Sequence, residues 1–569
     1  MRKRGAQFLA ASLAAVLALL LPAGIANAGD KTTAAVYAPD TWLRIETDHF
    51  IIYSNRTPDE TYREVAALEQ FRFFMEKLLP PGERSQSATE EKLQLFLLKS
   101  QSELDIVRPG FGGYVAGVYF FCEEGQSAFS AHIPLDADAA KVFHSQDQSQ
   151  LVVFHEYTHY LMARKGLNQF PMWYVEGLAD YYSTLEYDGT HFAVGAIPYD
   201  NNLLLNRFSW SGFETVLAPD KKYSSGLAVR GMANFALFYA RAWLLTHYMM
   251  SDPTRRAQLE DYFERLRRGE ASPAAFQAAT GISPTELASV LRAYSKAMTM
   301  HIEDAGEVPQ VSGDVDGLED SYGSFVYQEA VLGSCPSQKH GAALLDNIKL
   351  QSDPLRLKKL VDDAKPGPQR DADQFALDLA PKVQAEPEYA MAVAYGEILY
   401  GDPAAPRAGL TAIGKDDPRY ARAQYLLGRS YLKAAEKAEP DAKAALLAQA
   451  EPYLRIALAA MPDNGPAHYF LARSLDGSAD HEAEALDLAS KASSLIPSVF
   501  EYGSYAAILE LRAGHRDEAL AILDQYDNDP HDFKRNKLVD DAMAAIKAGK
   551  SPEDLQTLLT PPKDKDDDN

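Results

Sequence analysis

The stretch LVVFHEYTHYLM, residues 151–162, decides how the rest of this 569-residue chain is interpreted. It surrounds a polar centre with apolar residues and contains neither Gly nor Pro, so it predicts a buried helix, which we expect over Ser149–Lys165. His155 and His159 lie four residues apart, and on a helix this spacing places both imidazoles on one face. Two neutral imidazole nitrogens placed in this way can bind the same Zn²⁺ ion.

Three acidic residues complete the pattern. Glu156 follows the first histidine, where its carboxylate can take a proton from a water molecule and pass it to a leaving amine. A second stretch, PMWYVEGLADYYS at residues 171–183, supplies Glu176 as a third ligand, and two His with one Glu form a known catalytic zinc shell. Asp180, one turn later, is placed to accept the N–H of a liganding histidine. The alternative interpretation is a pair of core histidines and a solvated acidic face, but the two stretches together favour a metal site.

HEYTH followed by WYVEGLADYY resembles the gluzincin branch of the zinc metallopeptidases, the thermolysin-like clan. It is most similar to the peptidase MA-like group of exported bacterial proteins, and the resemblance covers about Trp42 to Met250. It implies an α+β zincin-like catalytic domain that binds one Zn²⁺ ion through His155, His159 and Glu176, with Glu156 as the general base.

The resemblance also implies a substrate-binding edge strand and a hydrogen-bond donor to the reacting carbonyl oxygen. We expect the edge strand at Ser127–Pro134, just before the histidine helix, where an added peptide would gain main-chain hydrogen bonds. A donor matters because negative charge develops on that oxygen in the transition state. Tyr239 is the first candidate and His247 the second. Core packing explains either residue equally well, because FALFYARAWLLTHYMM is apolar on most faces.

The first 28 residues have the form of a cleavable signal peptide. Basic residues at positions 2–4 precede the apolar run Phe8–Leu21, and Ala26-Asn27-Ala28 has the small-x-small form of a cleavage site after Ala28. The alternative is a membrane anchor, but the run is shorter than the roughly 20 apolar residues that a bilayer span needs. We therefore expect a periplasmic or secreted protein with no membrane span after signal removal.

Composition shifts divide the remainder of the chain. From residue 386 it becomes rich in Ala and Leu, and small residues recur at positions such as Gly428, Ala457 and Ala472. This region resembles degenerate tetratricopeptide repeats (TPR), for which an irregular helical bundle is the alternative. The predicted divisions are a signal peptide (1–28), a zincin-like metallopeptidase domain (29–302), a linker with connecting helices (303–385), an all-α TPR-like domain (386–545) and a charged disordered tail (546–569).

Charge and cysteine content narrow the function classes. A formal net charge of −24 argues against nucleic acid or an anionic membrane as a partner. Cys122 and Cys335 are the only cysteines, too few and too far apart for a Cys-based zinc site. An oxidising compartment permits a disulfide between them, and the sequence leaves open whether they pair.

The sequence therefore predicts an exported zinc metallopeptidase that hydrolyses peptide bonds in a peptide or protein substrate. Its helical repeats would offer a surface for a protein partner. Two alternatives stay open at this point. One is a non-catalytic helical-repeat scaffold with a vestigial or structural zinc site. The other is a zinc hydrolase that acts on a substrate other than a peptide, such as a cell-wall cross-link.

Overall fold

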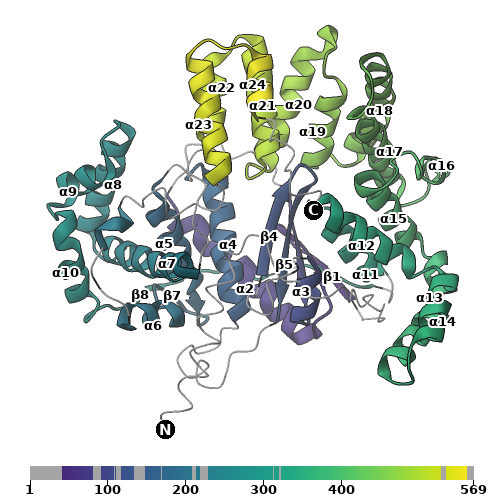
Figure 1. Ribbon diagram of the computed structural model, residues 1–569. Helices are drawn as coiled ribbons and strands as arrows, with labels where there is room; N and C mark the ends of the chain where they lie inside the picture. Colours follow the sequence, from purple (N-terminus) through teal and green to yellow (C-terminus); the bar gives the residue numbers. More distant parts are fainter. Residues whose placement is uncertain are drawn as a thin grey trace.

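The computed structural model shows an α+β part followed by a long curved series of helices (Figure 1). It describes residues 42–80, 91–107, 109, 117–132, 148–167, 170–207, 210, 213–217, 229–311, 313–318, 322–526 and 533–559. The predicted signal peptide, residues 1–28, lies outside the described residues. Among the described residues, no helix combines the length and the apolarity that crossing a bilayer requires.

A six-stranded mixed sheet forms the centre of the α+β part. Its strands, in spatial order, are β4 (Gly117–Cys122), β5 (Gly125–Ala131), β3 (Leu93–Leu98), β2 (Phe50–Ser54), β1 (Trp42–Glu46) and β9 (Asp314–Leu318). Strands β2, β3 and β5 are parallel, whereas β4 is antiparallel to β5, and β1 is antiparallel to both β2 and β9. In β3, Leu95 and Phe96 are buried in different cores because successive side chains point to opposite faces of the sheet.

Different parts of the chain cover the two faces of this sheet. On one face lie α2 (Pro58–Leu78) and α4 (Gln148–Lys165), whose Phe71 and Phe154 rings stack with centroids 4.0 Å apart. On the other face lie α3 (Gln101–Val107) and α11 (Tyr322–Leu332). The α+β part and the helical region therefore share a hydrophobic core through the sheet.

The predicted edge strand is wrong. Strand β5, which contains most of the predicted Ser127–Pro134 segment, pairs with β3 on one side and with β4 on the other. Residues 133 and 134 lie outside the described residues. A tight turn at Glu123 and Glu124 folds β4 back onto β5, so β4 is the outer strand at this end of the sheet.

A second helical group follows α4. It consists of α5 (Met172–Ser183), α6 (Tyr199–Arg207), the 3₁₀ helix η2 (Phe213–Val216), α7 (Val229–Met250), α8 (Pro253–Arg267), α9 (Ser272–Thr280) and α10 (Pro284–Tyr294). A small sheet of β6 (Glu186–Tyr187), β7 (His191–Val194) and β8 (His301–Asp304) accompanies it. Helix α5 crosses α7 at Gly177, where a methyl group would lie 2.4 Å from the Ala242 carbonyl oxygen. Glycine at this position therefore allows the close crossing.

The predicted linker is also wrong in its first part. Within residues 303–322, β8 extends to Asp304 and pairs with β7, and β9 pairs with β1. Main-chain pairing explains these strands despite the Gly- and Asp-rich sequence, because a ladder hydrogen bond does not depend on the side chain. The segment thus returns to the α+β part before the helical region begins.

The helices from α11 onward form one series, which we call the helical array (α11–α24). Its other members are α12 (Gln338–Leu350), α13 (Pro354–Asp363), α14 (Pro368–Ala385), α15 (Pro387–Tyr400), α16 (Arg407–Thr411), α17 (Tyr420–Ala435), α18 (Pro440–Ala460), α19 (Gly465–Ser474), α20 (Glu482–Leu495), α21 (Phe500–Ala513), α22 (Arg516–Asp524), α23 (Phe533–Lys547) and α24 (Pro552–Leu559). Helices that follow one another pack in pairs, such as α17 with α18 and α19 with α20. The array begins well before residue 386, since α11 and α12 both pack against α15.

The predicted disordered tail begins too early. Helix α23 continues to Lys547, and α24 occupies part of the 546–569 segment. Leu555 and Leu559 on α24 are buried in a core shared with α21 and α22. This apolar contact holds the segment in place, and residues 560–569 lie outside the described residues.

A disulfide joins the two parts of the chain. Cys122 at the end of β4 is bonded to Cys335, between α11 and α12, across a sequence separation of 213 residues. The pairing that the sequence left open is therefore present.

Candidate metal centre

The two histidines of α4 lie as their spacing predicts. Their Nε2 atoms are 3.0 Å apart, and each side chain is mostly buried. The helix has no interruption between Gln148 and Lys165, so its regular pitch places His155 and His159 on the same face.

Helix α5 brings the third predicted ligand to the same point. Glu176 is fully buried, and its Oε2 lies 3.5 Å from Nε2 of His155 and 3.5 Å from Nε2 of His159. The neighbouring Gly177 allows α5 to approach α7 closely, which draws Glu176 into the interior. A carboxylate in such a place is costly unless a proton or a cation balances it.

These three residues, His155, His159 and Glu176, could hold a metal ion, and we call them the metal cluster. A tetrahedral ion with bonds of about 2.0–2.1 Å would separate its ligand atoms by roughly 3.3 Å. The three atoms form a triangle with sides of 3.0, 3.5 and 3.5 Å. One ion can therefore contact all three side chains after only small adjustments of their positions.

A chain of hydrogen bonds orients the first histidine. Nδ1 of His155 lies 2.9 Å from Oδ1 of Asp180, as the spacing of Asp180 on α5 predicts. Asn201 of α6 donates from Nδ2 to the other oxygen of Asp180, at 3.1 Å. Asp180 thus holds Nδ1 in its protonated form and leaves Nε2 to face Glu176. The role of Asn201 has no signal in the sequence, because nothing about residue 201 indicates that α6 folds back onto α5.

The carboxylates also affect protonation of the cluster. Burial opposes charge on the ring of His155, but hydrogen bonds with Asp180 and Glu176 outweigh it and raise the pKa of His155 well above its ordinary value. A proton on His155 and a cation between the three ligands would neutralise the same carboxylates. Metal binding at this cluster therefore competes with protonation.

Glu156 lies on α4 next to His155 and faces a small cavity between α4 and the sheet. It lines this cavity together with Gly117, Val118 and Tyr119 of β4. A methyl group at Gly117 would lie 3.6 Å from Cγ1 of Val152, which shows how closely the start of β4 approaches α4. The candidate general base and the outer strand of the sheet are thus neighbours.

The two candidates for the hydrogen-bond donor, Tyr239 and His247, lie in different surroundings. The ring of Tyr239 on α7 lies 6.3 Å from that of His155, between centroids. Burial and the nearby Glu176 carboxylate raise the pKa of Tyr239 well above its ordinary value, so its hydroxyl keeps its proton. Tyr239 is therefore a neighbour of the metal cluster.

His247 lies two helical turns further along α7 and has a different environment. Its Nδ1 is 2.7 Å from the hydroxyl of Tyr294, and its ring packs against Tyr181 and Trp243. Burial lowers the pKa of His247 to about 4, so the ring is neutral. These contacts place His247 in the helical core rather than in the metal cluster.

No protein-family model matches the chain, and no curated protein matches it. The geometry of His155, His159, Glu176 and their neighbours therefore supplies the evidence for function.

Proposed function

We propose that this chain is an exported zinc metallopeptidase of the gluzincin type. The observation that carries the proposal is the triangle of Nε2, Nε2 and Oε2 atoms on α4 and α5 with Glu156 beside it. We further propose that the α+β part is a zincin-like domain and that the array consists of TPR-like repeats. Three protein ligands favour a catalytic ion over a structural one, because structural zinc sites usually have four.

The residues around the triangle have separate roles in this proposal. When bound by His155, His159 and Glu176, zinc polarises the scissile carbonyl and makes a water molecule more acidic. Glu156 takes a proton from the attacking water molecule while the oxygen of that water bonds to the carbonyl carbon. Glu156 then delivers that proton to the amine nitrogen as the C–N bond breaks, so the general base is regenerated.

Two further elements support a peptide as the substrate. The outer strand β4 offers main-chain groups to which an extended peptide can pair next to Glu156. The protonated hydroxyl of Tyr239 can donate to the carbonyl oxygen as negative charge develops there. The disulfide between Cys122 and Cys335 supports export, because such bonds persist in oxidising compartments.

The test compares the wild type with Glu156→Gln. We expect the purified wild type to contain one zinc per chain and to cleave members of a broad peptide library, with cleavage lost on chelation and restored by zinc. Glu156→Gln keeps the shape of the side chain but removes the base, so cleavage should fall by about 10²–10⁴-fold while zinc is retained.

Glu264→Gln is the matched control, because Glu264 is an exposed carboxylate on α8 and should leave cleavage unchanged. Two results would overturn the proposal. One is a zinc-loaded wild type that cleaves no peptide, and the other is undiminished cleavage by Glu156→Gln.

A further inference from the structure

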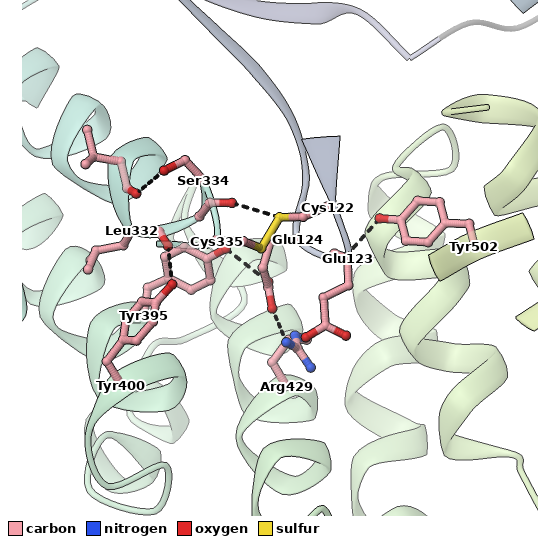
Figure 2. The surroundings of a disulfide bond; sticks show 12 residues. Cys122, Glu123, Glu124, Leu332, Ser334, Cys335, Tyr395, Tyr400, Arg429 and Tyr502 are labelled. Carbon is pink, nitrogen blue, oxygen red and sulfur yellow. Dashed lines mark hydrogen bonds and ion pairs between the residues drawn. A yellow bond between two sulfur atoms is a disulfide. The ribbon is translucent and has the colours of Figure 1, made fainter. Parts of the chain in front are cut away.

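The tip of the β4–β5 hairpin projects into the inner side of the helical array (Figures 1 and 2). Glu123 and Glu124 form the turn between the two strands. Helices α15, α17 and α21 each contribute a side chain that contacts this turn. We call these three side chains, which belong to Tyr395, Arg429 and Tyr502, the hairpin socket.

The centre of the hairpin socket is a buried ion pair. The guanidinium of Arg429 donates to Oε1 of Glu124, and their side chains are only 1% and 3% exposed. The hydroxyl of Tyr395 donates to Oε2 of Glu124 at 3.0 Å, so both carboxylate oxygens accept a hydrogen bond. The guanidinium of Arg429 also lies over the ring of Phe470, 3.4 Å from its centroid. A buried charge pair in which both carboxylate oxygens accept hydrogen bonds favours one geometry of the hairpin tip.

Contacts on either side of the pair hold the rest of the hairpin. Tyr502 donates from its hydroxyl to the main-chain carbonyl of Glu123, at 3.0 Å. Cys122 is fixed by its disulfide to Cys335, and the Tyr119 hydroxyl shares a hydrogen bond of 3.1 Å with Ser498. The array thus contacts β4 from its middle to its end. Figure 2 shows the contacts at the Cys122 end of the strand.

The other end of β4 lies at the cavity that Glu156 lines. Gly117 and Val118 line the same cavity as Glu156, whereas Cys122, five residues later, is bonded to the array. At a rise of about 3.4 Å per residue, roughly 17 Å separates these two ends of one straight strand. A shift of the hairpin tip would therefore move the edge beside Glu156.

We infer that the helical array positions strand β4, with Arg429 and Tyr395 as positioning residues for the edge to which a peptide substrate pairs. This inference rests on the proposed function for its catalytic part. The β4–β5 hairpin of the same chain therefore occupies part of the inner side of the array. Neither positioning residue contacts the metal ligands, so their effect passes through Glu124 and the strand.

The experiment compares Arg429→Met with Arg455→Met. Arg455 pairs with Glu451 and Glu484 on helices of the same array, but its side chain is 38% exposed and has no contact with the hairpin among those described. Three quantities are measured in each full-length protein: zinc per chain, amide hydrogen exchange over residues 117–122, and kcat and KM for peptides long enough to lie along β4.

For Arg429→Met we expect faster exchange in residues 117–122 and one zinc per chain. We also expect kcat/KM to fall by about 100-fold, the scale for a misplacement of around 1 Å, with most of the loss in KM. Arg455→Met should match the wild type in all three quantities. If folded Arg429→Met keeps the wild-type exchange and KM, the array does not position β4 and the inference is overturned.

Tyr395→Phe provides a second route if Arg429→Met does not fold. It removes one hydrogen bond from Glu124 and should change exchange and KM in the same direction by a smaller factor, and wild-type values for both would overturn the inference. Failure of the proposed function has a different signature, namely a wild type that cleaves nothing. In that event the exchange measurement still decides whether the array holds β4.

Discussion

The metal cluster and the hairpin socket both bury a glutamate, but they neutralise it differently. In the socket, Arg429 of the same chain pairs with Glu124. In the cluster, the ligand atoms 3.5 Å from Glu176 are imidazole nitrogens of His155 and His159. In the cluster, either a proton on His155 or a cation between the three ligands can balance the Glu176 charge, whereas the socket contains a fixed counter-charge in Arg429.

Matched Glu→Gln substitutions at the two sites should give the largest difference between the metal cluster and the hairpin socket. Glu176→Gln removes a ligand, so we expect zinc affinity to fall by more than about 100-fold, the upper end for loss of an outer partner. Glu124→Gln leaves Arg429 buried and unpaired, so we expect one zinc per chain but a free energy of unfolding lower by about 3–5 kcal/mol. Zinc analysis and chemical denaturation of both variants measure the two effects. Equal zinc content in the two variants would show that Glu176 is not a ligand.

Asp180→Asn should also weaken zinc binding, but by a smaller factor than Glu176→Gln. The amide cannot hold the Nδ1 proton of His155 as a carboxylate does, so we expect zinc affinity or activity to fall by about 10–100-fold. The fold should be retained, because α5 keeps its packing on α7. Zinc titration against a competing chelator gives the affinity. Wild-type affinity and activity in Asp180→Asn would remove Asp180 from the site.

The smallest expected effect concerns a third carboxyl group, that of the half-buried Glu91. Glu91 accepts a hydrogen bond of 2.8 Å from the amide of Gly465, the first residue of α19, and burial raises the pKa of Glu91 to about 8. The unfolded chain loses this proton near the ordinary value of about 4.3. Between these pH values the folded state binds more protons, so its stability falls as pH rises through 8.

Glu91→Gln cannot ionise and should therefore lose less stability than the wild type between pH 5 and pH 9. The difference should be modest, because Glu91 is only half-buried and solvent screens part of its charge. Denaturation midpoints at several pH values measure it. Parallel profiles for the two proteins would contradict the raised pKa.

Sequence patterns predicted that His155, His159 and Glu176 lie together, because the residues involved are local in sequence. The separation of His155 and His159 has a direct geometric meaning on a helix, and Glu176 lies on the next helix of the chain. The division into an α+β part and a helical region also followed from local periodicity. The position of Tyr239 beside the cluster, rather than that of His247, required the actual path of α7.

The hairpin socket could not be predicted in this way. Glu124 and Arg429 are 305 residues apart, and the two cysteines are separated by 213. Contacts between residues this far apart in sequence depend on how the array curves around the sheet, which no local pattern encodes. The edge strand was wrong for a similar reason, because strand order depends on pairing between segments that are not neighbours in sequence.

The central claim is that His155, His159 and Glu176 hold a zinc ion that works with Glu156. The most direct test is zinc content and peptide cleavage measured together on wild type and Glu156→Gln. We predict one zinc per chain in both proteins, with cleavage in the wild type and about 10²–10⁴-fold less in the variant. A wild type that binds no zinc, or a zinc-loaded wild type that cleaves no better than Glu156→Gln, would contradict the claim.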